Sequence, residues 1–422
     1  MRSSTFMRAA VRVSLVAVFA AGLSLAACGP SSSSGNKDLV IGTLLPVSGT
    51  DAGVGLPTQY GADLAISQNA DLGNGYKLSV LHENYDGANG ADTSIGAADA
   101  TTLINNTKVV AVVGPFNSGI AKVTIPITNG AGLTMISPTN TNPGLTKEPY
   151  AAANDIIFSQ LHPAGKPDAY FRTCGTDDVQ GKVDGDVAAA APVNGTKAYV
   201  VDDSTVYGKG LALQFTNEFK AKGGTVVGTA EITATQISTA PQLASQIISA
   251  GPDVVFYGGV TSQGGGALKK DLFDKGYTKP MVGGDGIADD PQWLVTAGDG
   301  AVNTFGTVAA PGVSTLTSAA ATKFKSDYTS YVAGKPNNDL LPYSVQAYDD
   351  AMIEITAIKS LISAGKDVTR ANVRDAVAGI NYNGLTGNIH FDSNGDNAGT
   401  KVFSVYTVDN TKQWVFLSQV TA

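Results

Sequence analysis

The chain contains few of the residues on which metal binding and nucleophilic catalysis depend. Its 422 residues include three histidines and two cysteines. His82, His162 and His390 are far apart in the sequence, and none has a His or Glu at metal-ligand spacing. If Cys28 is modified as argued below, Cys174 has no partner, which excludes a disulfide framework and a cysteine-rich metal site. We therefore expect no bound metal and no cofactor.

Positive charge is also scarce. The chain has 28 Lys and Arg against 36 Asp and Glu, a formal net charge of −8, and no long basic run. Phosphate contacts need clustered Lys and Arg, so nucleic acid is not an expected partner. The 49 glycines and a charged fraction of 15% indicate tight turns between buried elements rather than disorder. The length exceeds the size at which a single core stops growing, which predicts two lobes.

The N-terminus has the pattern of an export signal. Three arginines within residues 1–12 precede a run of small and apolar residues over 13–27. This run is shorter than the ~20 residues that span a bilayer, and it is typical of a signal peptide. Leu25-Ala26-Ala27-Cys28 resembles the bacterial lipobox, in which the thiol is alkylated with diacylglycerol and cleavage leaves the lipidated cysteine first.

We therefore predict a lipoprotein signal peptide over 1–27 and a flexible, lipid-anchored tether over 28–37. Ser31 to Gly35 is rich in serine, as flexible linkers are. The alternative is a plain signal peptide cut near Ala27, with Cys28 incidental. The prediction places the protein on the extracytoplasmic face of the cell membrane, held there by the lipid on Cys28.

Short apolar runs alternate with segments of helical spacing along most of the chain. This alternation predicts an α/β fold with parallel sheets covered on both faces, and ligands bind at the carboxyl ends of such strands. The predicted strands are 39–45, 76–85, 109–114, 133–137, 197–202, 225–232, 254–257 and 280–283. The predicted helices are 58–69, 94–105, 118–131, 208–223, 240–250, 262–276, 343–363 and 369–378, before a β-rich end over 385–417.

Two motifs suggest phosphate or calcium but lack a required residue. The glycine run from Gly258 to Gly266 has no Lys directly after its last glycine, as a P-loop requires. The segment from Asp392 to Asp396 begins like a calcium loop, but Phe403 stands where a bidentate Glu is needed. Both are better explained as turns. Gly42 to Gly49 also lacks the G-x-G-x-x-G spacing of a Rossmann nucleotide site.

Polar residues follow several predicted strands. Gly114-Pro-Phe-Asn-Ser118 joins a buried strand to a helix, and Ser137-Pro-Thr-Asn-Thr141 follows the next strand. Hydroxyls and free N–H groups at a helix N-terminus suit a carboxylate, because the helix dipole favours negative charge there. Asp285, at another strand end, could pair with an ammonium group on the same ligand. Alternatively, these residues are only helix caps.

With these residues the chain resembles the leucine/isoleucine/valine-binding proteins, type I periplasmic solute-binding components of ABC importers, in their lipid-anchored Gram-positive form. The resemblance covers nearly all of residues 38–420. It rests on Ile41–Gly49, Ile136–Thr146, Tyr207–Gly210, Asp253–Gly259 and Phe391–Asp396 in this order. It implies two Rossmann-like lobes with parallel sheets, joined by three hinge crossings.

The resemblance also implies the lobe boundaries. Lobe 1 would comprise residues 38–176 and 312–401. Lobe 2 would comprise 177–311 and a terminal strand within 402–422.

Seven ligand-binding residues follow from the resemblance. Ser118 would bind the α-carboxylate, Asp285 the α-ammonium, and Tyr207 would close over the ligand. The others are Thr139, Asn140 and Thr141 in the strand-end loop, and Asp177 near the hinge. The chain departs from the family where aromatic residues often stand, at Val260 and at Gly53-Val54-Gly55, which leaves the side-chain class of the ligand open.

We therefore expect a monomeric binding protein, not an enzyme, that captures a small amino acid by lobe closure and delivers it to an ABC permease. A branched-chain amino acid is the expected ligand. Amides, urea-like compounds and aromatic acids are alternatives within the same fold. A ligand-sensing receptor ectodomain and a Rossmann-type enzyme are alternatives of other classes.

Overall fold

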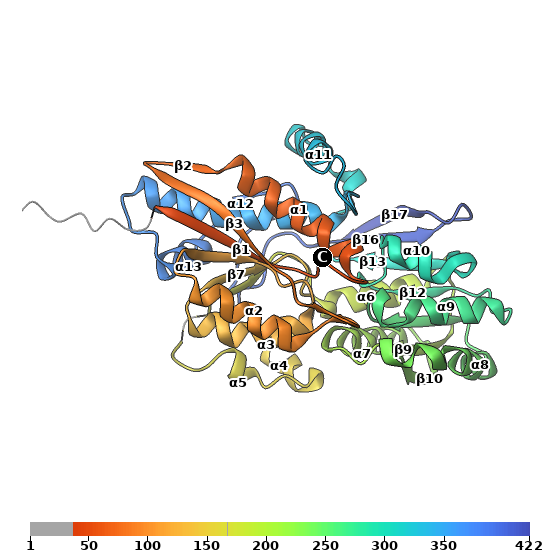
Figure 1. The fold of residues 1–422 in the computed structure, drawn as a ribbon. Helices are drawn as coiled ribbons and strands as arrows, with labels where there is room; N and C mark the ends of the chain where they lie inside the picture. The colour runs from red at the N-terminus through yellow and green to blue at the C-terminus, as the bar shows by residue number, and fades with distance from the viewer. Residues whose placement is uncertain (1–36, 167) are drawn as a thin grey trace, which may run out of the picture. The chain divides into compact units, whose positions relative to one another are not determined.

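The computed structural model describes residues 37–166 and 168–422, which form two sheets flanked by helices (Figure 1). The predicted signal peptide, Cys28 and most of the tether lie outside the described residues. Lobe 1 is defined here as the elements packed on the six-stranded sheet, and lobe 2 as those packed on the seven-stranded sheet. The structure confirms the predicted α/β fold class.

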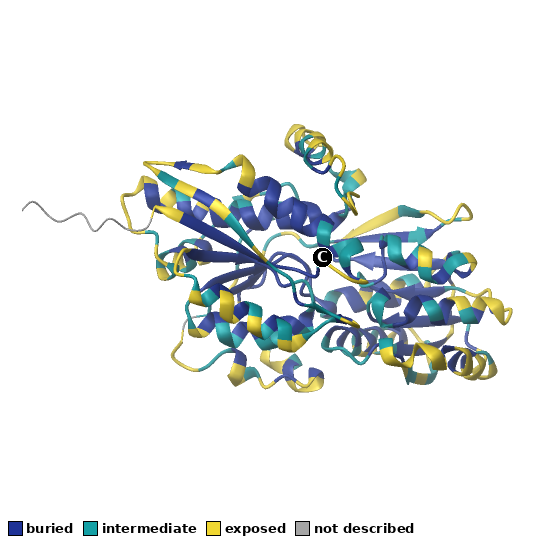
Figure 2. Cartoon of the chain, in the orientation of Figure 1, coloured by how far each residue is buried: buried dark blue, intermediate teal, exposed yellow. Residues whose placement is uncertain are grey.

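The sheet of lobe 1 has the strand order β2-β3-β1-β6-β7-β8. The pairs from β3 to β8 are parallel, and β2 is antiparallel to β3. The strands are β1 (Asp38–Leu44), β2 (Asp71–Gly73), β3 (Tyr76–Glu83), β6 (Val109–Val113), β7 (Thr134–Ser137) and β8 (Tyr170–Arg172). Every residue of β6 is buried, because helices cover both faces of the sheet. Figure 2 shows this burial along the strands and α12.

Alternate residues of β1 pack against different helices. Leu39 and Ile41 belong to a core with α1 (Ala52–Gln68), α12 (Pro342–Ser363) and α13 (Arg370–Ala378). Val40 belongs to a core on the other face with α2 (Thr93–Asn105) and α3 (Ser118–Gly130). This alternation is the expected result of the two-residue period of a strand.

The sheet of lobe 2 has the order β10-β9-β11-β12-β13-β16-β17. Its strands are β9 (Lys197–Asp202), β10 (Thr225–Glu231), β11 (Val254–Gly258), β12 (Met281–Gly283), β13 (Thr304–Val308), β16 (Val402–Val408) and β17 (Trp414–Thr421). The helices α6 (Asp177–Ala189) and α7 (Val206–Ala221) cover one face. The helices α8 (Ala240–Ala250), α9 (Gly265–Asp274) and α10 (Pro291–Ala297) cover the other. The end of the chain, expected to form one strand, forms two antiparallel strands.

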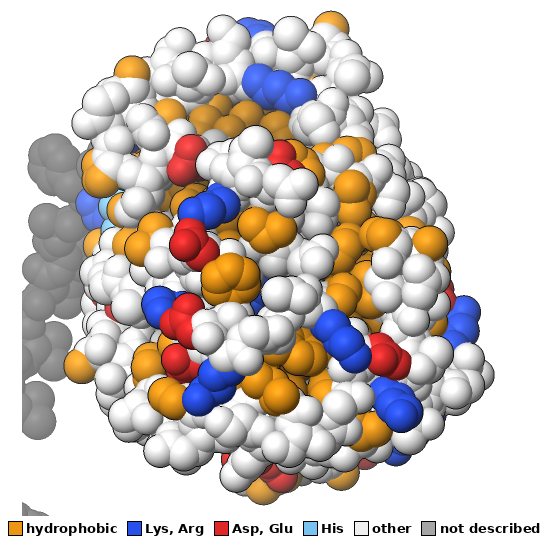
Figure 3. Space-filling model, turned by 90° about the vertical axis from the view of Figure 1, so that its right-hand side faces the viewer, with side chains coloured by type: hydrophobic (Ala, Val, Ile, Leu, Met, Phe, Trp, Pro, Cys, Tyr) orange, Lys and Arg blue, Asp and Glu red, His pale blue; other side chains and the backbone are white. Residues whose placement is uncertain are grey.

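Seven further helices and strands complete the elements named here. They are β4 (Asp86–Gly87), β5 (Gly90–Ala91), α4 (Glu148–Ala151), α5 (Phe158–Leu161), α11 (Ala319–Tyr331), β14 (Tyr382–Asn383) and β15 (Asn388–Ile389). The chain passes between the lobes three times: between β8 and α6, after β13, and before β16. The predicted three crossings are therefore confirmed. Figure 3 views lobe 2 from outside and shows both signs of charge interspersed among uncharged side chains on that face.

Helix α6 was not predicted, because its buried face is polar. Asp177, Gln180 and Asp184 are buried, so the segment lacks an apolar period. Gly181 faces α7, and a Cβ there would lie 2.4 Å from the Cβ of Gln214. Small residues thus allow the two helices to pack closely without an apolar stripe.

The described residues contain neither a helix that combines the length and apolar character needed to cross a membrane nor a metal-binding group of three or more His, Cys, Asp or Glu side chains.

Candidate functional site

A cavity of about 380 Å³ is lined by residues at the strand ends of both lobes. Lobe 1 contributes the start of α3, including Ser118, together with Thr139 from the loop after β7. Lobe 2 contributes Tyr207 from the start of α7, and Asp285 after β12. Strand ends and helix starts therefore meet at one place, as parallel sheets require.

Tyr85 fixes the residues that precede α3 and keeps the Asn117 side chain away from the N–H groups of the helix. The phenol oxygen of this buried residue accepts the backbone N–H groups of Phe116 (3.0 Å) and Asn117 (3.2 Å). The same hydroxyl donates to Asn117 Oδ1 at 2.9 Å, and the Asn117 side chain caps no N–H group of the helix. The first N–H groups of a helix need acceptors from outside it, and the helix dipole favours an anion there. The position of Ser118 therefore suits a carboxylate.

The loop after β7 is fixed by its own hydroxyls. Ser137 Oγ donates to Pro115 O at 2.7 Å and accepts the backbone N–H groups of Thr139 (3.2 Å) and Asn140 (2.9 Å). Thr139 Oγ1 donates to Phe116 O at 2.7 Å. The hydroxyl proton of Thr139 is thus used within the protein, and its oxygen remains able to accept a bond from a ligand.

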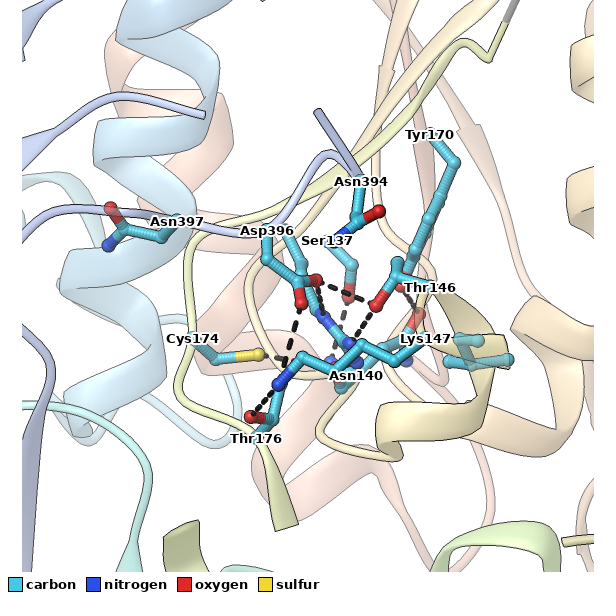
Figure 4. A network of polar contacts seen from close by, with 12 residues as sticks. Ser137, Asn140, Thr146, Lys147, Tyr170, Cys174, Thr176, Asn394, Asp396 and Asn397 are labelled. Carbon is cyan, nitrogen blue, oxygen red and sulfur yellow. Dashed lines mark hydrogen bonds and ion pairs between the residues drawn. The ribbon is translucent and has the colours of Figure 1, made fainter. Parts of the chain in front are cut away.

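A fully buried arginine, Arg172, fixes the same loop through a polar network that includes Asn140, Thr146 and Asp396, labelled in Figure 4. Arg172 Nη1 donates to the carbonyl oxygens of Asn140 (2.8 Å) and Asn142 (2.7 Å), and its Nε donates to Asp396 Oδ1 at 2.6 Å. Burial alone would raise the pKa of Asp396, but the Arg172 guanidinium brings this pKa below its ordinary value. Charge-assisted bonds of this kind are among the strongest in proteins, so the loop is tied to the third crossing.

In lobe 2, Asp285 is surrounded by three donors. Its Oδ1 accepts from Tyr207 Oη (2.8 Å) and Gln180 Nε2 (3.0 Å), and its Oδ2 accepts from Tyr343 Oη (2.5 Å). Burial raises the pKa of Asp285, and these three hydrogen bonds oppose the shift. Tyr343 belongs to α12 of lobe 1, so its bond to Asp285 also joins the lobes.

Four of the seven predicted site residues therefore line one cavity: Ser118, Thr139, Tyr207 and Asp285. The other three, Asn140, Thr141 and Asp177, are not among the residues that line it.

Those three residues are buried beside the crossings. The side chain of Asn140 donates to Phe116 O at 2.7 Å and accepts from Tyr170 Oη at 3.0 Å. The backbone N–H of Asp177 donates to Thr141 O at 2.8 Å. Burial raises the pKa of Asp177, and neither of its carboxylate oxygens has a hydrogen-bond partner.

Among the site residues that were not predicted from the sequence, three carry a charge or hold a charged group in place. Asp51 and Lys122 line the cavity, and Tyr343 holds Asp285. Asp51 stands just after the first predicted strand and Lys122 lies one helical turn after Ser118, so their positions were available as signals. Tyr343 belongs to a helix distant in the sequence, and no local pattern points to its role.

Two α/β lobes with three crossings and a ligand-sized cavity between their strand ends define a two-lobed solute-binding protein. A family profile described as periplasmic binding protein matches residues 38–413. The chain belongs to this family, whose members bind solutes and are not enzymes.

Relatives with known names support this assignment. The Leu/Ile/Val-binding protein homolog 1 of Brucella abortus is 30% identical over 297 residues, covering 68% of this chain and 71% of the relative. The leucine-binding protein LivK of Thermotoga maritima has a TM-score of 0.75 at 22% identity, over 90% of this chain and 98% of that protein.

Two further structures share the fold. LivJ of Streptococcus pneumoniae, in complex with isoleucine, has a TM-score of 0.73 at 24% identity, over 91% of this chain and 99% of that protein. A solute-binding protein of R. palustris, in complex with 4-hydroxybenzoate, has a TM-score of 0.72 at 18% identity, over 91% of this chain and 97% of that protein. At these identities the likeness concerns the fold and leaves the ligand open.

Proposed function

We propose that this protein is the solute-binding component of an ABC importer and captures a small α-amino acid between its lobes. The observation that carries the proposal is the pairing of an anion-binding helix start at Ser118 with the Asp285 carboxylate around one cavity. A free amino acid has one group for each: a carboxylate for α3 and an ammonium for Asp285.

Closure would follow from contacts that the ligand stabilises. Bonds between the lobes already include Tyr343 to Asp285, Asn142 Nδ2 to Val206 O (2.8 Å) and Gln263 Nε2 to Asn89 O (2.9 Å). A ligand held by both lobes binds the closed state better than the open one and shifts the population toward it. Exclusion of water strengthens each charge-assisted bond in the closed cavity.

The names of the relatives make branched-chain amino acids the first ligands to test. A second candidate is an aromatic acid, because the R. palustris protein of the same fold holds 4-hydroxybenzoate. An aromatic acid has no ammonium group, so it would leave Asp285 without a cationic partner. Amides and urea-like compounds would share the Asp285 contact but not the carboxylate site.

Delivery to a permease and attachment to the membrane complete the proposal. The lipobox at Cys28 supports a lipid anchor on the extracytoplasmic face, and the family assignment supports a permease partner. We also propose that lobe boundaries lie near 176/177, 311/312 and 401/402. A role as a ligand-sensing ectodomain would require a separate signalling partner.

Thermal unfolding of the purified protein with a panel of ligands tests the proposal. A ligand at 100 times its Kd should stabilise the native state by ~2.7 kcal/mol, which raises Tm by a few degrees. Saturable stabilisation by at least one α-amino acid is the expected result. Stabilisation only by 4-hydroxybenzoate or benzoate would overturn the amino-acid assignment and favour the second candidate.

A further inference from the structure

A second carboxylate, Asp51, lines the cavity apart from the donors that surround Asp285. Asp51 precedes helix α1, and only 7% of its surface is exposed. Its Oδ2 atom has no hydrogen-bond partner, and its side chain caps no N–H group of α1. A buried carboxylate oxygen without a partner is costly, so the position needs a reason.

Burial raises the pKa of Asp51, and its uncharged neighbours, the Ser262 side chain and the Ala91 backbone N–H, only partly oppose the shift. Gly90 and Asp51 of lobe 1 lie close to Ser262 of lobe 2. A Cβ atom added to Gly90 would lie 3.2 Å from Asp51 Oδ2 and 3.1 Å from Ser262 Oγ. Gln263 is next to them, but its Nε2 donates to Asn89 O at 2.9 Å and its Oε1 accepts from Ala234 N at 3.1 Å. The oxygen of Gln263 and one of its two N–H groups are therefore already used.

The charges of the cavity lining are unbalanced toward the acidic side. Among its described lining residues, the charged ones are Asp51, Lys122 and Asp285. Lys122 lies on α3 with Ser118, at the end that suits a carboxylate, and Asp285 suits an ammonium. A zwitterionic amino acid would therefore match Lys122 and Asp285 and leave Asp51 unmatched.

The neighbouring carboxylates do not relieve Asp51. Burial and the charge of Asp51 raise the pKa of Asp86 to about 7. Asp290 caps α10, where its Oδ1 accepts from Gln292 N at 2.8 Å. A nitrogen group from the ligand would meet a need that the protein leaves open here.

We propose that the ligand is an α-amino acid whose side chain ends in an N–H donor group, cationic or amide, and that Asp51 accepts its hydrogen bond. This inference rests on the proposed function and names the side-chain class that the family resemblance leaves open. An aliphatic side chain would leave Asp51 Oδ2, which is already buried, without a partner. A site built to accept a hydrogen bond rejects analogues that cannot donate one.

Isothermal titration of the purified protein with matched ligand pairs tests the proposal. Lysine is compared with norleucine, which lacks only the ammonium, and glutamine with glutamate, which replaces the donor by an acceptor. We expect at least one nitrogen-bearing ligand to bind tenfold or more tightly than its matched partner and than leucine. The first pair reports a cationic donor and the second an amide donor. Tighter binding of leucine, isoleucine or valine than of all four would overturn the inference and leave the proposed function standing.

The variant Asp51→Ala tests the residue itself. It should reduce the preference within the successful pair at least tenfold, while norleucine and leucine bind as tightly as before or more tightly. Asp86→Asn is the matched control, because Asp86 is the adjacent carboxylate but does not line the cavity; we expect less than a threefold change. An unchanged preference in folded Asp51→Ala contradicts the role of Asp51. If that variant does not fold, the wild-type pairs still decide.

Compounds without α-groups separate the two proposals. Binding of cadaverine or pentanamide, with no binding of any amino acid, would overturn the proposed function and support the donor inference. Binding of benzoate alone would overturn both.

Discussion

At the scale of single residues, Ser118 and Asp285 are expected to carry most of the recognition of the α-groups. Ser118→Ala removes a hydroxyl at the start of α3, and Asp285→Ala removes the carboxylate that three donors hold in place. Each variant should weaken amino-acid binding tenfold or more, which is about 1.4 kcal/mol or above. Titration calorimetry with the tightest wild-type ligand measures the change.

Two controls make this result specific. Ser245→Ala removes an exposed hydroxyl on α8 and should leave Kd within twofold. Asp285→Asn keeps the size of the side chain and removes its charge, so it should weaken binding nearly as much as Asp285→Ala. Affinity that stays unchanged in both Ser118→Ala and Asp285→Ala would remove this site assignment.

The site residues at strand ends could be predicted because parallel strands bring their carboxyl ends to one edge. Ser118, Thr139 and Asp285 follow buried strands and do line the cavity. Asn140 stands between Thr139 and Thr141, and the sequence could not tell that Tyr170 and Phe116 would engage its side chain. Asp51 was missed although it follows the first predicted strand, because a local pattern does not show that α1 packs against α10 of the other lobe.

At the scale of elements, long apolar runs were predicted, whereas helix α6 with its polar buried face and the short buried strands β8 and β13 were not. The run Val109–Val113 reads as a strand because both of its faces are covered by helices. Helix α6 has no such signature, since Asp177, Gln180 and Asp184 are on its buried side. Helix α1 begins at Ala52 rather than Thr58, because it continues through Pro57.

The polar face of α6 predicts a dependence of stability on pH. Burial raises the pKa of Asp184 from 3.8 to about 8, while Thr307 Oγ1 donates to its Oδ1 at 2.6 Å and its Oδ2 has no partner. The folded state therefore holds a proton that the unfolded chain releases near pH 4. The contribution of this proton to the free energy of unfolding is complete below pH 4. It is lost as the pH rises toward 8, on the order of 1.4 kcal/mol per pH unit.

Urea unfolding of Asp184→Asn at pH 5 and pH 8 checks this dependence. Asn resembles the protonated acid, so the variant should gain stability over the wild type at pH 8 and gain much less at pH 5. Asp186→Asn on the same helix removes an exposed carboxylate paired with Lys222 and should change stability by about 1 kcal/mol or less at both pH values. An equal gain for Asp184→Asn at both pH values would show that its carboxylate is not protonated in the folded state.

At the scale of the whole molecule, the coupling of ligand binding to closure depends on bonds between lobes that do not touch the ligand. Asn142 is buried outside the cavity lining, and its Nδ2 donates to Val206 O at the start of α7. Asn142→Ala removes this bond, so it should favour the open state and weaken binding about tenfold, through faster dissociation rather than slower association.

Asn129→Ala is the matched control, because Asn129 is an equally buried asparagine whose bonds, to Leu161 O and from Ala169 N, stay within lobe 1. Both variants should lose stability, but only Asn142→Ala should change the dissociation rate measured by stopped flow. Small-angle X-ray scattering supplies a second readout: at equal ligand saturation, the wild type and Asn129→Ala should contract to the same radius of gyration. A dissociation rate that rises equally in both variants would mean that affinity follows the general stability of lobe 1, and that Asn142 has no separate part in closure.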